Sequence, residues 1–264
     1  MANPECAPLI NQRGAERGGH IGRLHASIVA AVRVEIASDV VCPWCYIGKR
    51  RFERAVASLA DDGVTLDLQV RHRAYLLDPH APLDSPVPVR EAYARKFGGE
   101  QHAERILADV TKVAADEGIT FNMHRAIRAN TMRAHRLLKI VERHALENRA
   151  IDHGATNGGA ADLQVLVNES IMRAYFTEGK DISRVDTLVE CAERVGFNHA
   201  ALAERLSSEA PDEPSLRAVQ EDLAWVAARD IAAVPTFVIN DSFAVPGAQD
   251  SATFERLLKR LGPS

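Results

Sequence analysis

The chain has 264 residues, of which 46% are hydrophobic and 26% are charged, as in ordinary globular proteins that bury a full core. Its net charge of -4 gives no electrostatic reason to expect binding to nucleic acid or to an anionic membrane. No apolar run approaches the roughly 18 residues that a membrane-spanning helix requires. We therefore expect neither nucleic acid nor membrane as a partner.

The N-terminal segment differs from the rest of the chain. It carries Arg13, Arg17 and Arg23, followed by the short apolar stretch Ala26–Val32. A secretory signal requires a charged start, an apolar region of about 7–15 residues and a cleavage site of small residues. Here the apolar stretch leads directly into the first predicted strand, so cleavage would damage the fold. We expect residues 1–31 to be a disordered extension and the protein to be cytoplasmic.

The first predicted elements surround a pair of cysteines. Arg33–Ser38 alternates and is rich in β-branched residues, which predicts a strand. The motif Cys42-Pro43-Trp44-Cys45 follows, and apolar residues over Tyr46–Leu59 recur at helical spacing. Proline suits the first turn of a helix, where its missing N–H costs nothing. Val64–Arg73 alternates and predicts a second strand. Strand, CxxC at a helix start, helix and strand form the opening unit of a thioredoxin-like fold.

A long helical block follows. Apolar residues at helical spacing, separated by charged intervals, predict helices over Glu100–Glu117, Asn130–Glu147, Leu163–Tyr175, Val185–Val195, His199–Leu206 and Pro211–Arg229. Strand character returns at Thr236–Asn240, and the pair Asn240-Asp241 predicts a hairpin turn into Ser242–Val245. A last helix is predicted over Thr253–Leu261.

This order predicts an α/β protein with a thioredoxin-like fold and a large all-helical insertion. We expect the thioredoxin-like domain to comprise residues 32–80 and 225–264. The inserted helical domain is then residues 81–224.

The spacing of Cys42 and Cys45 is that of a redox-active pair. Disulfide exchange requires a thiolate, a second thiol nearby and an accessible site. At a helix start, unpaired N–H groups and the helix dipole stabilise an anion on Cys42, and Cys45 lies one turn away. We expect Cys42 to attack and Cys45 to resolve, with Trp44 lining the site. The alternative is half of a zinc site, but zinc commonly takes four ligands and no second CxxC is present.

The expected second half of the site is Val234-Pro235-Thr236. At this place, just before a strand, thioredoxin-like proteins hold a cis-proline beside the sulfurs. The backbone of Val234 would then be free to pair with an extended substrate segment. Because Pro235 would pack against the dithiol, we expect no room for further metal ligands. No metal or organic cofactor is predicted.

The sequence resembles the DsbA-family oxidoreductases and, within them, the FrnE-like branch. The resemblance covers about residues 33–262. It is carried by SDVVCPWC at 38–45, by NT and AHRLL at 130–131 and 134–138, by AYFTEGKDI at 174–182, and by VPTFV and GAQ at 234–238 and 247–249. It implies dithiol–disulfide oxidoreductase or isomerase activity, a cytoplasmic setting and a homodimer. The implied partner is a protein that contains a disulfide or dithiol, or a low-molecular-weight thiol such as glutathione.

Two other functions remain open. Related 2-hydroxychromene-2-carboxylate isomerases and kappa-type glutathione-dependent enzymes act on small aromatic substrates, and they have serine where this chain has Cys42. The presence of both Cys42 and Cys45 favours redox chemistry over isomerisation. A non-catalytic binding module is the third alternative.

Three residues outside the motif have both a structural and a functional interpretation. Cys191 lies mid-helix, where it is most simply a small buried apolar residue, and a second redox cysteine is the alternative. Because His135 lies in the stretch that resembles the family, the resemblance implies a position near the site, where His135 either packs and forms hydrogen bonds or takes a catalytic role. Asn130 either caps a helix or lines the cleft.

Overall fold

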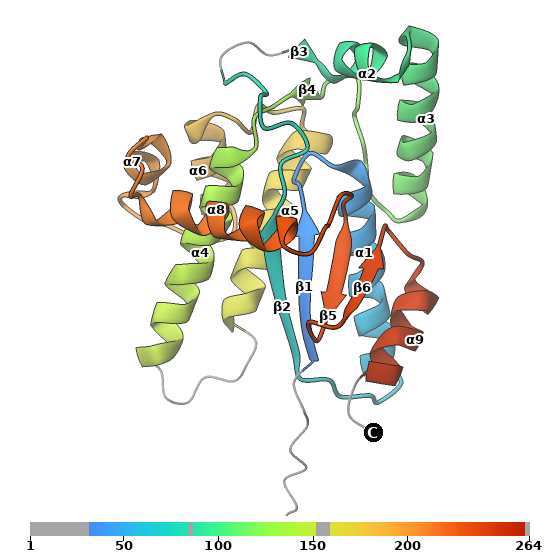
Figure 1. Cartoon of the computed structure of the whole chain (residues 1–264), viewed down its shortest axis with the longest axis vertical. Helices are drawn as coiled ribbons and strands as arrows, with labels where there is room; N and C mark the ends of the chain where they lie inside the picture. Colours follow the sequence, from blue (N-terminus) through green and yellow to red (C-terminus); the bar gives the residue numbers. More distant parts are fainter. Residues whose placement is uncertain (1–31, 84–86, 152–158, 262–264) are drawn as a thin grey trace, which may run out of the picture.

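The computed structural model describes residues 32–83, 87–151 and 159–261 (Figure 1). The expected disordered extension, residues 1–31, lies outside these described residues. Among the helices of the described ranges, none is long and apolar enough to cross a membrane.

A four-stranded sheet forms the centre of the molecule, in the order β2-β1-β5-β6. β1 (Val32–Ser38) runs parallel to β2 (Leu68–Ala74) and antiparallel to β5 (Thr236–Ile239), which pairs in turn with β6 (Phe243–Pro246). Ala37, near the end of β1, pairs with the first residue of β5. The chain that leaves β1 and the chain that enters β5 therefore lie side by side, although they are far apart in sequence.

The structure confirms the predicted hairpin and shortens the second predicted strand. Asn240 and Asp241 both adopt positive φ, at 49° and 55°, as a tight turn between twisted strands requires. β2 begins at Leu68 and not at Val64. The Val64 N–H donates to the carbonyl oxygen of Leu59 at 2.9 Å, so it closes the end of a helix instead of joining the sheet.

Two helices pack on the sheet through an aromatic cluster. These are α1 (Pro43–Asp61) and α9 (Ser251–Leu261). The rings of Phe52 of α1, Phe237 of β5 and Phe254 of α9 pack together in tilted and edge-to-face geometries, with ring centroids 4.6 to 5.5 Å apart. Burial of such aromatic side chains contributes much of the stabilisation of a core, and it fixes α1 against the sheet.

The long helical block is also confirmed, with small differences at the helix ends. It contains α3 (Glu100–Asp116), α4 (Met132–Ile151), α5 (Gly159–Phe176), α6 (Val185–Glu193), α7 (Leu202–Ser207) and α8 (Pro214–Ala227). The structure adds helix α2 (Val89–Phe97) and the two-residue strands β3 (Val87–Pro88) and β4 (Ile127–Arg128). Two-residue strands are too short to leave a periodic pattern in a sequence.

α8 returns the chain to the sheet and crosses in front of β2 in Figure 1. Its Asp222 is 1% exposed and accepts hydrogen bonds from the N–H of Ala74 (3.0 Å) and from Arg73 (2.8 Å). Lys139 of α4 forms an ion pair with it at 2.6 Å. The predicted domain boundary at 224/225 falls inside this helix, and the division into two domains remains our proposal.

α1 belongs to two hydrophobic cores. Phe52 and Leu59, toward its end, join the core of the sheet. Cys45 and Ile47, at its beginning, join a larger core built mainly from α3, α4, α5 and α6. The start of α1, with the CxxC motif, therefore lies where the sheet meets the helical block.

Candidate active site

Cys42 is the N-cap residue of α1. Its backbone is extended, with φ -84° and ψ 115°, and Pro43 is the first residue of the helix. The carbonyl oxygen of Cys42 accepts from the N–H groups of Cys45 (3.0 Å) and Tyr46 (3.3 Å), which begins the helical hydrogen bonding. The motif thus starts a helix as the sequence predicts, and the Cys42 side chain lies at the positive end of the helix dipole.

The two cysteines of the motif approach to 3.3 Å and are not joined by a disulfide. Cys42 is 5% exposed and Cys45 is 2% exposed. Burial raises the pKa of the Cys45 thiol well above its ordinary value, and a hydrogen bond with Cys42 and the charge of Cys42 raise it further. Cys42 is therefore less exposed to a partner than a site predicted from sequence to be accessible. The raised pKa keeps Cys45 as a neutral thiol.

The predicted second half of the site lies beside the first. The Val234–Pro235 peptide bond is cis, as predicted. The thiol of Cys42 donates to the carbonyl oxygen of Val234 at 3.7 Å. Pro235 packs against Gly48 of α1, where an added Cβ would lie 3.0 Å from its Cγ atom and 3.3 Å from the Cα atom of Ala248. The lack of a side chain at position 48 permits this close approach.

The middle residues of the motif differ in exposure. Pro43 is buried, whereas Trp44 is 44% exposed and places a large apolar side chain at the surface next to Cys42. Exposed aromatic side chains of this kind are frequent contact points for partners. That Trp44 lines the site stays a prediction, and the exposure of its side chain leaves it accessible to a partner.

A buried acid lies next to the motif. Asp39 is fully buried, and its carboxylate accepts from the N–H of Leu77 at 2.8 Å and contacts His135 Nε2 at 3.3 Å. Its charge is one of the causes that raise the Cys45 pKa. Sequence reasoning placed His135 near the site but did not single out Asp39 as a site residue. The position of Asp39, an acidic residue between a predicted strand and the CxxC motif, was the sequence signal that could have identified it.

α2 contributes a further neighbour that the sequence did not reveal. Burial raises the pKa of Tyr93 to about 12, and the charge of Cys42 acts in the same direction. Tyr93 packs against the hydrophobic core that contains Cys42 and Cys45. No motif or spacing connects Tyr93 with Cys42, because only the fold of the helical block brings α2 near the start of α1.

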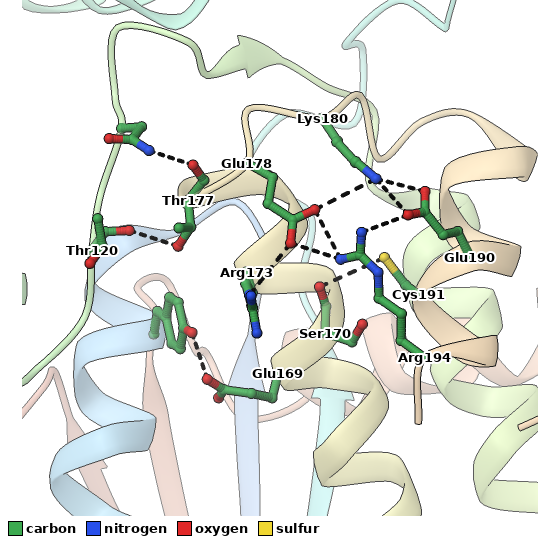
Figure 2. Close-up of polar contacts among 12 residues, drawn as sticks. Thr120, Glu169, Ser170, Arg173, Thr177, Glu178, Lys180, Glu190, Cys191 and Arg194 are labelled. Carbon is green, nitrogen blue, oxygen red and sulfur yellow. Dashed lines mark hydrogen bonds and ion pairs between the residues drawn. The ribbon is translucent and has the colours of Figure 1, made fainter. Parts of the chain in front are cut away.

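Cys191 and Asn130 have structural roles. Cys191 is 1% exposed, its thiol donates to the carbonyl oxygen of Ser170 at 3.7 Å, and burial raises its pKa (Figure 2). Asn130 caps α4 by accepting from the N–H of Met132 at 3.0 Å, and it donates to the carbonyl oxygen of Ala81 at 2.8 Å. Both agree with the simpler of their two interpretations.

The described ranges contain no group of three or more His, Cys, Asp or Glu side chains arranged to hold a metal ion. A structural zinc ion commonly takes four such ligands. The zinc interpretation of Cys42 and Cys45 therefore finds no supporting ligand set in this part of the chain.

Comparison with known proteins agrees with this architecture. The model of the DsbA-like thioredoxin domain family matches residues 33–155 and 151–259. The chain belongs to this family. As a DsbA-like protein it is an enzyme of the thiol–disulfide oxidoreductase or isomerase class, and the resemblance to the DsbA family is confirmed.

Individual relatives differ in their sequence identity to this chain. A probable DsbA oxidoreductase from Streptomyces coelicolor is 27% identical, with a TM-score of 0.70, and the match covers 87% of this chain and 89% of that one. The uncharacterized protein YwbO of Bacillus subtilis (strain 168) is 25% identical over 231 residues, which are 86% of this chain and 96% of that protein.

Two solved structures of lower sequence identity share only the fold with this chain. The cytosolic disulfide reductase DsbM from Pseudomonas aeruginosa is 17% identical, with a TM-score of 0.54 and coverage of 86% of this chain and 97% of that one. A 2-hydroxychromene-2-carboxylate isomerase is 18% identical, with a TM-score of 0.52 and coverage of 87% and 95%.

Proposed function

We propose that this protein is a dithiol–disulfide oxidoreductase that exchanges disulfides through Cys42 and Cys45. The observation that carries the proposal is the arrangement around Cys42. Its sulfur lies at the start of α1, with Cys45 at 3.3 Å and the Val234 carbonyl oxygen at 3.7 Å. A helix start stabilises the thiolate that disulfide exchange requires, and the second thiol is within bonding reach.

The proposed reaction has two exchange steps. The Cys42 thiolate attacks a substrate disulfide, forms a mixed disulfide and releases one substrate sulfur as a thiolate. The Cys45 sulfur, after loss of its proton, then attacks Cys42 and releases the second substrate sulfur. The substrate gains two electrons, and the Cys42–Cys45 pair becomes a disulfide. The same steps in reverse oxidise a substrate dithiol.

The substrate is proposed to contact Pro43, Trp44, Val234 and Pro235. Because Cys42 is only 5% exposed, the geometry favours a thin partner, such as an extended polypeptide segment or a small thiol. The structure of DsbM with GSH supports glutathione as such a thiol. Trp44 would supply apolar contact area beside the reacting sulfur.

The proposed setting of this protein is the cytoplasm. The support is the similar fold of DsbM, which is a cytosolic disulfide reductase. A homodimer is proposed from the FrnE-like resemblance. Fractionation of the source cells and sedimentation of the purified full chain would test these two statements separately.

The second candidate is a glutathione-dependent enzyme or isomerase that acts on a small aromatic ligand. Its support is the shared fold of the 2-hydroxychromene-2-carboxylate isomerase. The contact between Cys42 and Cys45 favours the redox function, because an isomerase of that kind has no use for a resolving thiol. Isomerase activity that survives in the Cys42→Ser, Cys45→Ser double variant would support this candidate instead.

The decisive measurement is equilibration of the protein with a series of reduced and oxidised glutathione mixtures. Mass spectrometry of thiol-labelled protein would follow the Cys42–Cys45 disulfide. We expect a reversible two-electron couple between about -270 and -120 mV, the range of known catalytic dithiols. A protein that forms no such disulfide at any glutathione ratio would overturn the proposal.

A further inference from the structure

Three consecutive carbonyl groups ahead of β5, those of residues 232–234, each accept a hydrogen bond from a side chain. The Tyr75 hydroxyl donates to the first of them at 3.3 Å. The Thr236 hydroxyl donates to the second at 2.8 Å, and the Cys42 thiol donates to the third at 3.7 Å. The backbone that contacts the reacting sulfur is therefore held by side chains over three successive peptide groups.

Tyr75 is the long-range member of this set. It follows β2, and its N–H donates to the carbonyl oxygen of Ser38 at the end of β1 at 3.0 Å. β1 lies between β2 and β5 in the sheet (Figure 1). The Tyr75 side chain therefore crosses the end of β1 to reach Ala232, which is 157 positions away in the sequence.

Side-chain packing contributes little to the position of this segment. Ala232 and Ala233 are exposed, and each has only a methyl group as its side chain. A methyl group at the surface buries too little apolar area to fix a backbone. The orientation of these peptide groups therefore depends on hydrogen bonds, and the hydroxyl of Tyr75 supplies one from a distant part of the chain.

We propose that Tyr75 is a positioning residue that holds the Val234 carbonyl oxygen for an extended polypeptide substrate, and that it thereby favours polypeptides over small disulfides. The inference rests on the proposed function. When Cys42 forms the mixed disulfide, it has lost its thiol hydrogen. The Val234 carbonyl oxygen then loses the donor that occupies it in the reduced protein. A backbone N–H of the bound polypeptide takes that place if the carbonyl oxygen keeps its orientation.

A small disulfide such as Ellman's reagent has no backbone N–H to donate, so it gains nothing from an oriented Val234 carbonyl group. The Tyr75 hydroxyl should therefore affect the reaction with a polypeptide and not the reaction with such a reagent. Tyr75→Phe tests this directly, because phenylalanine retains the aromatic ring and removes only the hydroxyl.

The experiment compares two reagents that release the same product. One is Ellman's reagent, and the other is a linear peptide whose central cysteine is joined to thionitrobenzoate through a disulfide. With each reagent the Cys42 thiolate forms a mixed disulfide, and thionitrobenzoate leaves as a thiolate that is followed by stopped-flow absorbance. The parent is the full chain with Cys6→Ser, Cys45→Ser and Cys191→Ser, in which Cys42 is the reacting thiol.

In Tyr75→Phe we expect the second-order rate constant with the peptide to fall by about threefold to tenfold, as the loss of one hydrogen bond implies. The rate constant with Ellman's reagent should not change. Tyr175→Phe is the matched control, because it removes a hydroxyl that donates to a different backbone carbonyl, that of Ile127, at 2.8 Å. It should leave both rate constants unchanged.

A modified peptide shows whether the effect depends on the Val234 carbonyl oxygen. Methylation of the backbone nitrogens of the cysteine and of its two neighbours removes the N–H donors nearest the reacting sulfur. The parent and Tyr75→Phe should react with this peptide at the same rate, because both changes remove one shared interaction. A methylated peptide that Tyr75→Phe slows as much as the unmodified one would overturn the inference.

The outcomes separate the inference from the function on which it rests. If Cys42 of the parent reacts with neither reagent, the proposed function fails. If it reacts with both, but Tyr75→Phe retains the parent's rate with the peptide, the role of Tyr75 is overturned. Equal slowing with both reagents, or the same slowing in Tyr175→Phe, would also overturn it. The effect would then lie in the reactivity of Cys42 or in a general loss of stability.

Discussion

The sulfur of Cys42 lies 3.7 Å from the carbonyl oxygen of Val234, although 192 positions separate the two residues in the chain. One comes from the start of α1 and the other from the segment that enters β5. The sheet brings them together, because β1 and β5 are hydrogen-bonded neighbours. The helical block between them supplies His135 and Tyr93, so the site draws on the whole described length of the chain.

The two motif cysteines should have distinguishable roles. Cys45→Ser should accumulate a stable mixed disulfide with glutathione or a substrate, because nothing remains to resolve it. Cys42→Ser should form none, and Cys191→Ser should behave as the parent because its thiol is buried and its pKa is raised. Intact-protein mass spectrometry would measure this. A mixed disulfide on Cys45 in the Cys42→Ser variant would reverse the assignment.

Gly48→Val should disturb the contact between α1 and Pro235. An added Cβ already lies 3.0 Å from Pro235 and 3.3 Å from the backbone of Ala248, and the γ-methyl groups need further space. Overpacking of this kind costs about 1–3 kcal/mol in the free energy of unfolding. Urea denaturation would test this, with Ala57→Val on an exposed part of the same helix as control. Equal small losses in both variants would contradict the predicted clash.

The stability of the protein should fall in mild acid because of His72. Burial and the charges of Lys49, Lys139 and His135 lower its pKa from 6.5 to about 3, whereas Asp222 acts in the opposite direction. The unfolded chain therefore binds an extra proton below pH 6.5, and stability present above that pH is lost as the pH falls toward 3. Each pH unit below 6.5 costs about 1.4 kcal/mol.

His72→Gln removes this titration while retaining an acceptor for Asn168. Between pH 7.5 and pH 5.5 the parent should lose about 1 kcal/mol more free energy of unfolding than the variant does. His124→Gln, at an exposed position, should lose as much as the parent. Parallel losses in the parent and in His72→Gln would show that another group causes the acid sensitivity.

Asp222→Asn should be strongly destabilising. The substitution removes the negative charge that Arg73 and Lys139 share, and Lys139 is only 5% exposed. Loss of one partner from a buried ion pair costs about 3 kcal/mol or more. Glu221→Gln changes an exposed neighbour on the same helix and should alter the free energy of unfolding little. A thermal or urea unfolding curve of each variant would measure the difference.

Much of the fold could be predicted from local patterns. The alternation at Arg33–Ser38, the helical spacing after Cys45 and the turn pair Asn240-Asp241 depend on neighbours within a few residues, so the sequence specifies them directly. The CxxC motif at a helix start predicted the contact of Cys42 and Cys45 by the same local logic. The cis bond before Pro235 followed from the position of that proline ahead of a strand.

Other features were decided only by tertiary structure. The start of β2 depended on the carbonyl group to which Val64 donates its N–H. The packing of α2 decided that Tyr93 lies in the core that contains Cys42. The segment at Val234 decided how exposed Cys42 is. The contact between Asp39 and His135 joins residues 96 positions apart. Burial, charge and hydrogen bonds between distant segments leave no periodic trace in a sequence, because they arise only when packing brings those segments together. The sequence therefore determined the reactive pair, and the fold decided which groups surround it.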